Sequence, residues 1–136
     1  MPTSVQTVVD FTATFIEAWP SGDAIRLGPF FAEDAVYHNV PLEPVRGRAA
    51  IQATFGEFMS MGGHVGVDIS HMVAEGSIVM IERVDHFIRG DTKISLPMMG
   101  VIEVRDGVIS AWRDYFDLTQ FASQVAGGVS SDRWHG

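Results

Sequence analysis

Cysteine is absent from this chain of 136 residues. Its absence excludes disulfides, thiol catalysis and zinc sites built on cysteine. Positive charge is scarce as well, because nine Lys and Arg face 17 Asp and Glu, the only lysine is Lys93, and the formal net charge is -8. Nucleic acids and anionic membranes are bound through clustered Lys and Arg, so neither is expected as a partner.

Long apolar runs are missing too, and none approaches the length of a membrane span. Residues 1–10 lack a basic region followed by an apolar stretch, so we expect no signal peptide and a cytoplasmic protein. What is present is a globular composition, with 46% hydrophobic and 19% charged residues. We expect one domain over residues 1–136, whose Gly- and Ser-rich end, residues 127–136, forms a mobile tail or a flap.

Helical spacing characterises the first half of the chain. Apolar residues recur every three or four positions between a capping Thr3 or Ser4 and Trp19. Residues 20–23 contain Pro and Gly, which end this helix, and Asp23 can cap the next one. The predicted elements are a helix to about residue 19, a short helix through residues 30–31, a strand over 35–40 and a helix over 48–61.

The spacing changes to a period of two after Gly62-Gly63, which is typical of β-strands. Asp106-Gly107 is a strong two-residue hairpin signal, and Gly90-Asp91 marks a looser turn. Helices followed by an antiparallel meander predict an α+β fold, with the helices against one face of a sheet. The strands predicted in this half cover residues 65–71, 77–88, 93–104 and 108–118.

Polar side chains interrupt the apolar faces of three predicted strands. Side chains two apart on a strand point to the same side, so Tyr37 and Asn39 share one face, and Arg83 and Asp85 share another. Asp114 lies between two aromatic residues on its own strand face. Because unpaired charges among apolar groups are costly, these residues form a candidate site if the three faces line one concavity.

Such a cluster is suited to acid–base chemistry. Arg83 can bind two carboxylates at once through its planar donors. Two neighbouring Asp side chains titrate as a pair, which supplies one acid and one base near neutral pH. That pair suits a reaction that removes and donates protons together, such as the addition of water to a strained ring. The alternation of side chains along the strands leaves a second interpretation open, namely a buried salt-bridge network that holds the strand register.

Four segments carry a resemblance to a known family, the limonene-1,2-epoxide hydrolases. The resemblance runs from about residue 30 to residue 121, and its most specific part is the last segment combined with Arg-x-Asp. The segments are Tyr37-His38-Asn39, Pro41-Leu42-Glu43-Pro44 with Gly47-Arg48, Glu82-Arg83-Val84-Asp85, and Trp112-Arg113-Asp114-Tyr115-Phe116-Asp117.

The resemblance implies a fold and an activity. The fold is the α+β fold of nuclear transport factor 2, a cone-shaped, curved mixed β-sheet with N-terminal helices over its concave side. The activity is the addition of water to a small apolar epoxide, terpene-like or cyclic, which gives a vicinal diol in one step without a covalent intermediate. The family uses no cofactor or metal and is usually dimeric, so we expect a cofactor-free homodimer.

Residue by residue, the resemblance also implies roles. Asp114 is the base that takes a proton from water, and Tyr37 with Asn39 holds that water. Asp85 is the acid that protonates the epoxide oxygen, and Arg83 bridges the two carboxylates. The candidates for the apolar pocket wall are Phe87, Leu96, Met98, Phe116 and Phe121.

Two other functions are compatible with some of these residues. Tyr37 and Asp85 also suit an isomerase or cyclase on the same fold, although the bridging Arg83 disfavours it. A non-catalytic module that binds a small apolar ligand is the alternative of a different class. A nucleophile elbow, which a covalent α/β-hydrolase route needs, is missing. The histidines have no spacing typical of metal ligands, so no metal is expected; they include His38, His64, His71 and His86.

Overall fold

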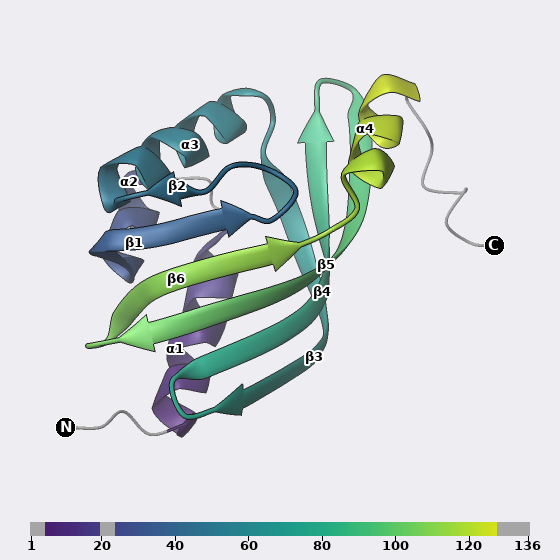
Figure 1. Cartoon of the computed structure of the whole chain (residues 1–136). Coiled ribbons are helices and arrows are strands. Elements are labelled where there is room, and N and C mark those ends of the chain that lie inside the picture. The colour runs from purple at the N-terminus through teal and green to yellow at the C-terminus, as the bar shows by residue number, and fades with distance from the viewer. Residues whose placement is uncertain (1–4, 20–23, 128–136) are drawn as a thin grey trace.

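A strongly curved sheet with helices in its concavity forms the molecule, as the computed structural model shows for residues 5–19 and 24–127 (Figure 1). The helices are α1 (Val5–Ala18), α2 (Ala24–Leu27), the 3₁₀ turn η2 (Gly28–Phe30), α3 (Arg48–Ser60) and α4 (Leu118–Gly127). The strands are β1 (Phe31–Asn39), β2 (Val45–Arg46), β3 (His64–Glu75), β4 (Ile78–Arg89), β5 (Thr92–Arg105) and β6 (Val108–Tyr115). The predicted α+β fold is confirmed.

The sheet has the order β2-β1-β6-β5-β4-β3. Strands β3 to β6 form the predicted antiparallel meander, and Asp106-Gly107 makes the predicted hairpin, with φ of 53° and 79°. Strand β1 adds to β6 in parallel, which makes the sheet mixed. This pair aligns Tyr37 with Trp112 and Asn39 with Asp114, so it brings the early polar pair to the late aspartate.

Aromatic side chains fill the core between α1, α3 and the inner sheet face. Trp112 is the centre of this cluster, and its ring lies 5.2 Å from that of Phe15 and 5.0 Å from that of Trp19. Phe55 reaches Trp19 from α3, with 4.5 Å between ring centroids. Trp19 is therefore in the core where the first helix meets the sheet. None of the helices in the described ranges is long and apolar enough to cross a membrane.

Two sequence predictions about element bounds are wrong. The strand predicted over residues 108–118 ends at Tyr115, and α4 begins at Leu118, because Asp117 Oδ1 accepts the Gln120 N–H at 3.2 Å and caps a helix. The sequence analysis predicted no helix after this strand. Phe31 opens a strand instead of ending a helix, since β1 begins four residues earlier than predicted. The caps at Thr3, Ser4 and Asp23 and residues 128–136 lie outside the described residues.

Candidate active site

Two strands, β4 and β6, place the charged residues on the inner face of the sheet. Arg83, Asp85 and Asp114 are each only 2% exposed. Strand β4 alternates as predicted, since Arg83 and Asp85 point inward while their immediate neighbours are half-buried or exposed. Met98 and Leu96 of β5 lie directly across from them in the register. The fold therefore brings these polar residues together on one sheet face, as predicted.

Arg83 links the two carboxylates. Its Nε donates to Asp85 Oδ1 at 2.7 Å and its Nη2 to Asp85 Oδ2 at 3.2 Å, while the same Nη2 donates to Asp114 Oδ2 at 2.7 Å. Trp112 Nε1 donates to the other oxygen of Asp114 at 2.8 Å. Both Asp114 oxygens are thus bonded, which fixes the orientation of its carboxylate. This role of Trp112 was not predicted, although its position two residues before Asp114 was a signal for it.

Gly100 makes room for this cluster. It faces Arg83 and Asp114 from the neighbouring strand β5, and it pairs with Asp114 in the β5–β6 register. A Cβ at this position would overlap Arg83 Nη1 and would lie 2.7 Å from Asp114 Oδ1. Every larger residue would therefore push the guanidinium away from the carboxylate. This close approach was not predicted from the sequence.

Burial and charge shift the ionisation of the site. Burial raises the pKa of Asp114, and the attraction of Arg83 offsets only part of that rise. Burial alone would lower the pKa of Arg83, but the two carboxylates outweigh it and hold the pKa above the ordinary value. Burial and the charge of Asp114 also raise the pKa of Tyr37. Arg83 thus remains a cation, Tyr37 remains a neutral phenol, and Asp114 is a stronger base than an exposed aspartate.

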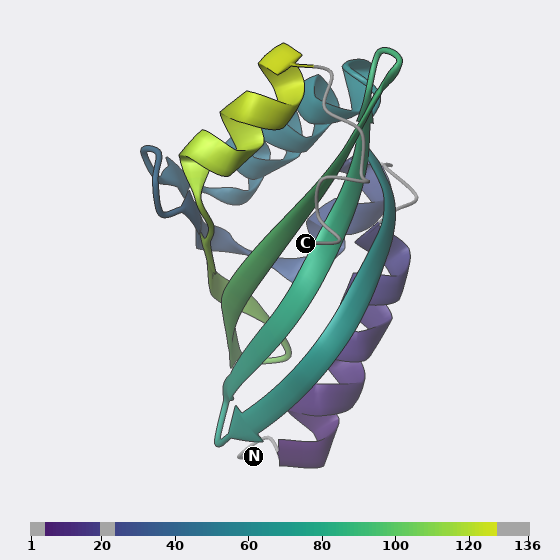
Figure 2. The same cartoon turned by 90° about the vertical axis from the view of Figure 1, so that its right-hand side faces the viewer.

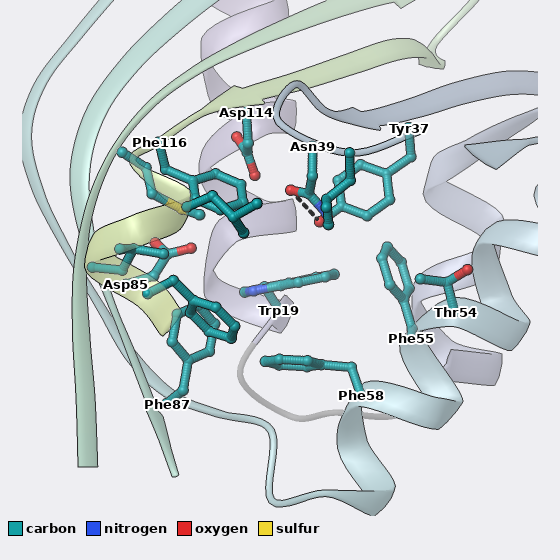
Figure 3. Close-up of a pocket in the computed structure, with 15 residues that line it drawn as sticks. Trp19, Tyr37, Asn39, Thr54, Phe55, Phe58, Asp85, Phe87, Asp114 and Phe116 are labelled. Atoms are coloured by element: carbon teal, nitrogen blue, oxygen red, sulfur yellow. Dashed lines mark hydrogen bonds between the residues drawn. The ribbon is translucent and has the colours of Figure 1, made fainter. Parts of the chain in front are cut away.

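An apolar cavity of about 170 Å³ opens beside the charged cluster (Figure 3). Asp85, Asp114, Tyr37 and Asn39 reach it, and Tyr37 Oη donates to Asn39 Oδ1 at 3.3 Å. Arg83 holds the carboxylates from behind without lining the cavity. All of the predicted wall residues line it, namely Phe87, Leu96, Met98, Phe116 and Phe121.

Further side chains that the sequence analysis did not assign to the site complete the wall. Phe55 and Phe58 of α3 line the cavity opposite the sheet, and their spacing on the predicted apolar side of that helix was the available signal (Figure 3). Trp19 serves both the core and the cavity. The remaining members are Leu42, Thr54 and Leu118. Within residues 5–19 and 24–127, no group of His, Asp and Glu could hold a metal ion.

Two buried carboxylates that share one arginine beside an apolar cavity define an acid–base site on a curved α+β sheet. The comparisons agree with this class: the family model of the limonene-1,2-epoxide hydrolase catalytic domain matches residues 4–126. The chain belongs to the limonene-1,2-epoxide hydrolase family, which confirms the resemblance and assigns it to the epoxide hydrolases.

Known proteins similar to the chain include hydrolases of this kind. The chain is 36% identical to epoxide hydrolase EphG of Mycobacterium tuberculosis over 106 residues, which cover 76% of this chain and 69% of that protein. A solved LEH-like epoxide hydrolase of M. tuberculosis has a TM-score of 0.81 at 28% identity, over 91% of this chain and 92% of that one. The epoxide hydrolase/cyclase-like enzyme SalBIII has a TM-score of 0.76 at 19% identity, over 85% and 94% of the chains, a likeness of fold alone.

Proposed function

We propose that this protein adds water to a small apolar epoxide, cyclic or terpene-like, and releases a vicinal diol. The observation that carries the proposal is the arrangement of Asp85 and Asp114, which both face the cavity and are both bonded to Arg83. A fixed cation between two buried carboxylates allows one of them to be ionised while the other keeps a proton. An acid and a base then act on one small substrate.

In the proposed mechanism, Asp114 is the general base. Tyr37 and Asn39 hold a water molecule beside it, since the phenol oxygen can accept and the amide N–H groups can donate hydrogen bonds. Asp114 removes a proton while the water oxygen bonds to an epoxide carbon. The C–O bond of the ring breaks as Asp85 gives its proton to the epoxide oxygen. Proton transfer from Asp114 back to Asp85 restores the site, so water and epoxide are fully accounted for in the diol.

The cavity supports a compact substrate. Its volume of about 170 Å³ is below the roughly 300–1,000 Å³ of pockets for drug-sized ligands. Most of its wall is aromatic or aliphatic, and the few polar groups that reach it are those of Asp85, Asp114, Tyr37, Asn39 and Thr54 (Figure 3). An epoxide with a hydrocarbon ring fits this division, because its oxygen can meet Asp85 while its ring meets the apolar wall.

The test of this proposal is product formation. Purified protein is incubated with limonene oxide and cyclohexene oxide in the presence of a metal chelator, and diol is measured by gas chromatography. We expect diol from at least one epoxide, and no diol above background from these or a panel of similar epoxides would overturn the proposal. In a single turnover in oxygen-18 water, label should appear in the diol, whereas label in an Asp carboxylate would indicate a covalent route.

We also propose a homodimer through the outer face of the sheet. Apolar side chains remain exposed there, and Val73 pairs with Met80 while Met99 pairs with Tyr115 across neighbouring strands. A second copy would cover them, as expected from the family. Light scattering after gel filtration should give twice the 14.9 kDa chain mass. Met80→Glu should give the monomer mass, and a wild-type monomer would overturn this assignment.

A further inference from the structure

Along residues 92–98 of strand β5, one edge has no strand beside it among the described residues. The last pair of β5 with β6 is Met99 with Tyr115, so β5 extends past the end of β6 toward its own beginning at Thr92. Ser95 lies in this stretch, and on its other side it pairs with His86 of β4. A strand edge of this kind leaves main-chain N–H and C=O groups that require partners when they are not in water.

Gln124 of helix α4 supplies hydrogen-bond partners for the main-chain N–H and C=O groups of Ser95. Its Nε2 donates to the Ser95 carbonyl oxygen at 2.9 Å, and the Ser95 N–H donates to its Oε1 at 2.9 Å. A side-chain amide carries one donor and one acceptor group, as the peptide group of a neighbouring strand does. Gln124 is only 2% exposed although it is polar. The pair of hydrogen bonds between Gln124 and Ser95 is called here the Gln124 clamp. It takes the place of the hydrogen bonds that a neighbouring strand would make with Ser95.

The clamp determines where α4 lies. Phe121 and Val125 of α4 pack against the apolar cluster that includes Phe87 and Leu96, and Phe121 also lines the cavity. Leu118, at the start of α4, lines the cavity while 39% exposed, so it belongs to the rim. Figures 1 and 2 show α4 and α3 at the same end of the sheet. Helix α4 is thus a wall of the cavity, and its apolar side chains and the clamp hold it to the sheet.

We propose that Gln124 is a positioning residue that keeps α4 closed over the substrate cavity and thereby sets the affinity for a compact epoxide. The proposal rests on the proposed function for its substrate, but the clamp itself is independent of it. Without the clamp, the half-buried main-chain groups of Ser95 would bond to water instead, and α4 would move off the β5 edge. The two carboxylates would not move, because Asp85 and Asp114 are on β4 and β6 and are held by Arg83.

The first experiment is a kinetic comparison with Gln124→Met, which keeps the side-chain length and removes both hydrogen bonds. With cyclohexene oxide we expect KM to rise about tenfold and kcat to stay within about threefold, the pattern of lost uniform binding. Ser123→Ala on the exposed side of α4 is the first control. Ser95→Ala is the second, since it removes only the hydroxyl, which lies 2.9 Å from His86 Nδ1, and keeps both main-chain groups of the clamp. Both controls should retain the wild-type KM.

Gln124→Glu provides a rescue that depends on the clamp chemistry. A protonated Glu carboxyl offers one donor and one acceptor, as Gln does, whereas an ionised carboxylate only accepts and would face the Ser95 carbonyl oxygen. The KM ratio of Gln124→Glu to wild type should therefore be near one at the acid end of the activity range and should rise with pH. A ratio that does not change with pH would overturn the proposed role of the donor.

Amide exchange of Ser95, followed by NMR, tests the clamp without any turnover. Exchange should be slow in wild type and in Ser123→Ala and at least about tenfold faster in Gln124→Met. Faster exchange with an unchanged KM would overturn the role in substrate binding, and unchanged exchange would overturn the clamp. If wild type forms no diol, the proposed function fails, and the affinity for cyclohexane-1,2-diol replaces KM. An equal affinity of wild type and Gln124→Met would then overturn the inference.

Discussion

The inner face of the sheet has two different halves, and strand β4 contributes side chains to both. Toward one end of β4, Val79 and Ile81 are completely buried in the core that α1 and α3 cover. Farther along β4, Arg83, Asp85 and Phe87 are also buried, but Asp85 and Phe87 border the cavity. The first half is filled by side chains and the second half is not. The comparison shows that charge is tolerated on this face where the helices leave space and where Arg83 compensates it.

Among changes in the half that borders the cavity, removal of one carboxylate should have the largest effect on kcat. Asp85→Asn and Asp114→Asn should each lower kcat by roughly 10³-fold or more, because general acid or base catalysis is lost. The fold should persist, which circular dichroism and gel filtration would show. Since the filled half of β4 is unaltered, substantial activity in either folded variant would remove the role proposed for that residue.

Gly100→Ala should have the next largest effect. The added Cβ would overlap Arg83 Nη1 and crowd Asp114, so kcat should fall by about 10²-fold, as for a misplaced catalytic group. The control is Gly56→Ala on α3, where a Cβ would meet nothing within 4 Å. That control should keep full activity and should be more stable by about 0.5–1 kcal/mol, because alanine is the better helix former. An active Gly100→Ala enzyme would show that the cluster tolerates displacement.

Truncation of apolar residues should separate the two halves by stability. Ile81→Ala, in the filled half, should reduce the free energy of unfolding by about 2–5 kcal/mol, because it opens a void in a packed core. Leu96→Ala should cost less, roughly 1–2 kcal/mol, since one side of Leu96 already faces the cavity. It should instead raise KM. Urea denaturation and steady-state kinetics check both, and equal stability losses would contradict the distinction.

The pH dependence should show the smallest effect. Burial raises the pKa of Asp114, and only the ionised carboxylate can act as a base. The fall of kcat/KM toward acid pH should therefore be centred above the ordinary aspartate value of about 3.9. Trp112 donates to this carboxylate and stabilises its ionised form, so Trp112→Phe should move the midpoint to still higher pH. A midpoint that moves to lower pH would contradict this view of Asp114.

The local elements of the fold could be predicted well from the sequence. Period-two spacing in β4 and β5 and the Asp106-Gly107 turn specify strands and a hairpin through interactions between near neighbours, and the structure confirms them. The parallel pairing of β1 with β6 could not be predicted from spacing, because its partners are about 75 residues apart and no local interaction selects them. Helix α4 was missed because it is short and carries the polar Gln124 on its apolar side.

The candidate site divides in the same way. The sequence by itself placed Arg83 and Asp85 on one strand face through the alternation of side chains, and its family resemblance led to the proposed roles of acid, base and cation. It also determined, through the matched segments, the family to which the chain belongs. Only the tertiary structure decided that Asp114 meets Arg83 at 2.7 Å, that Gly100 gives them room, and that Gln124 closes the β5 edge. These are contacts between distant segments, and they depend on how the sheet curves and on the space that the helices leave inside it.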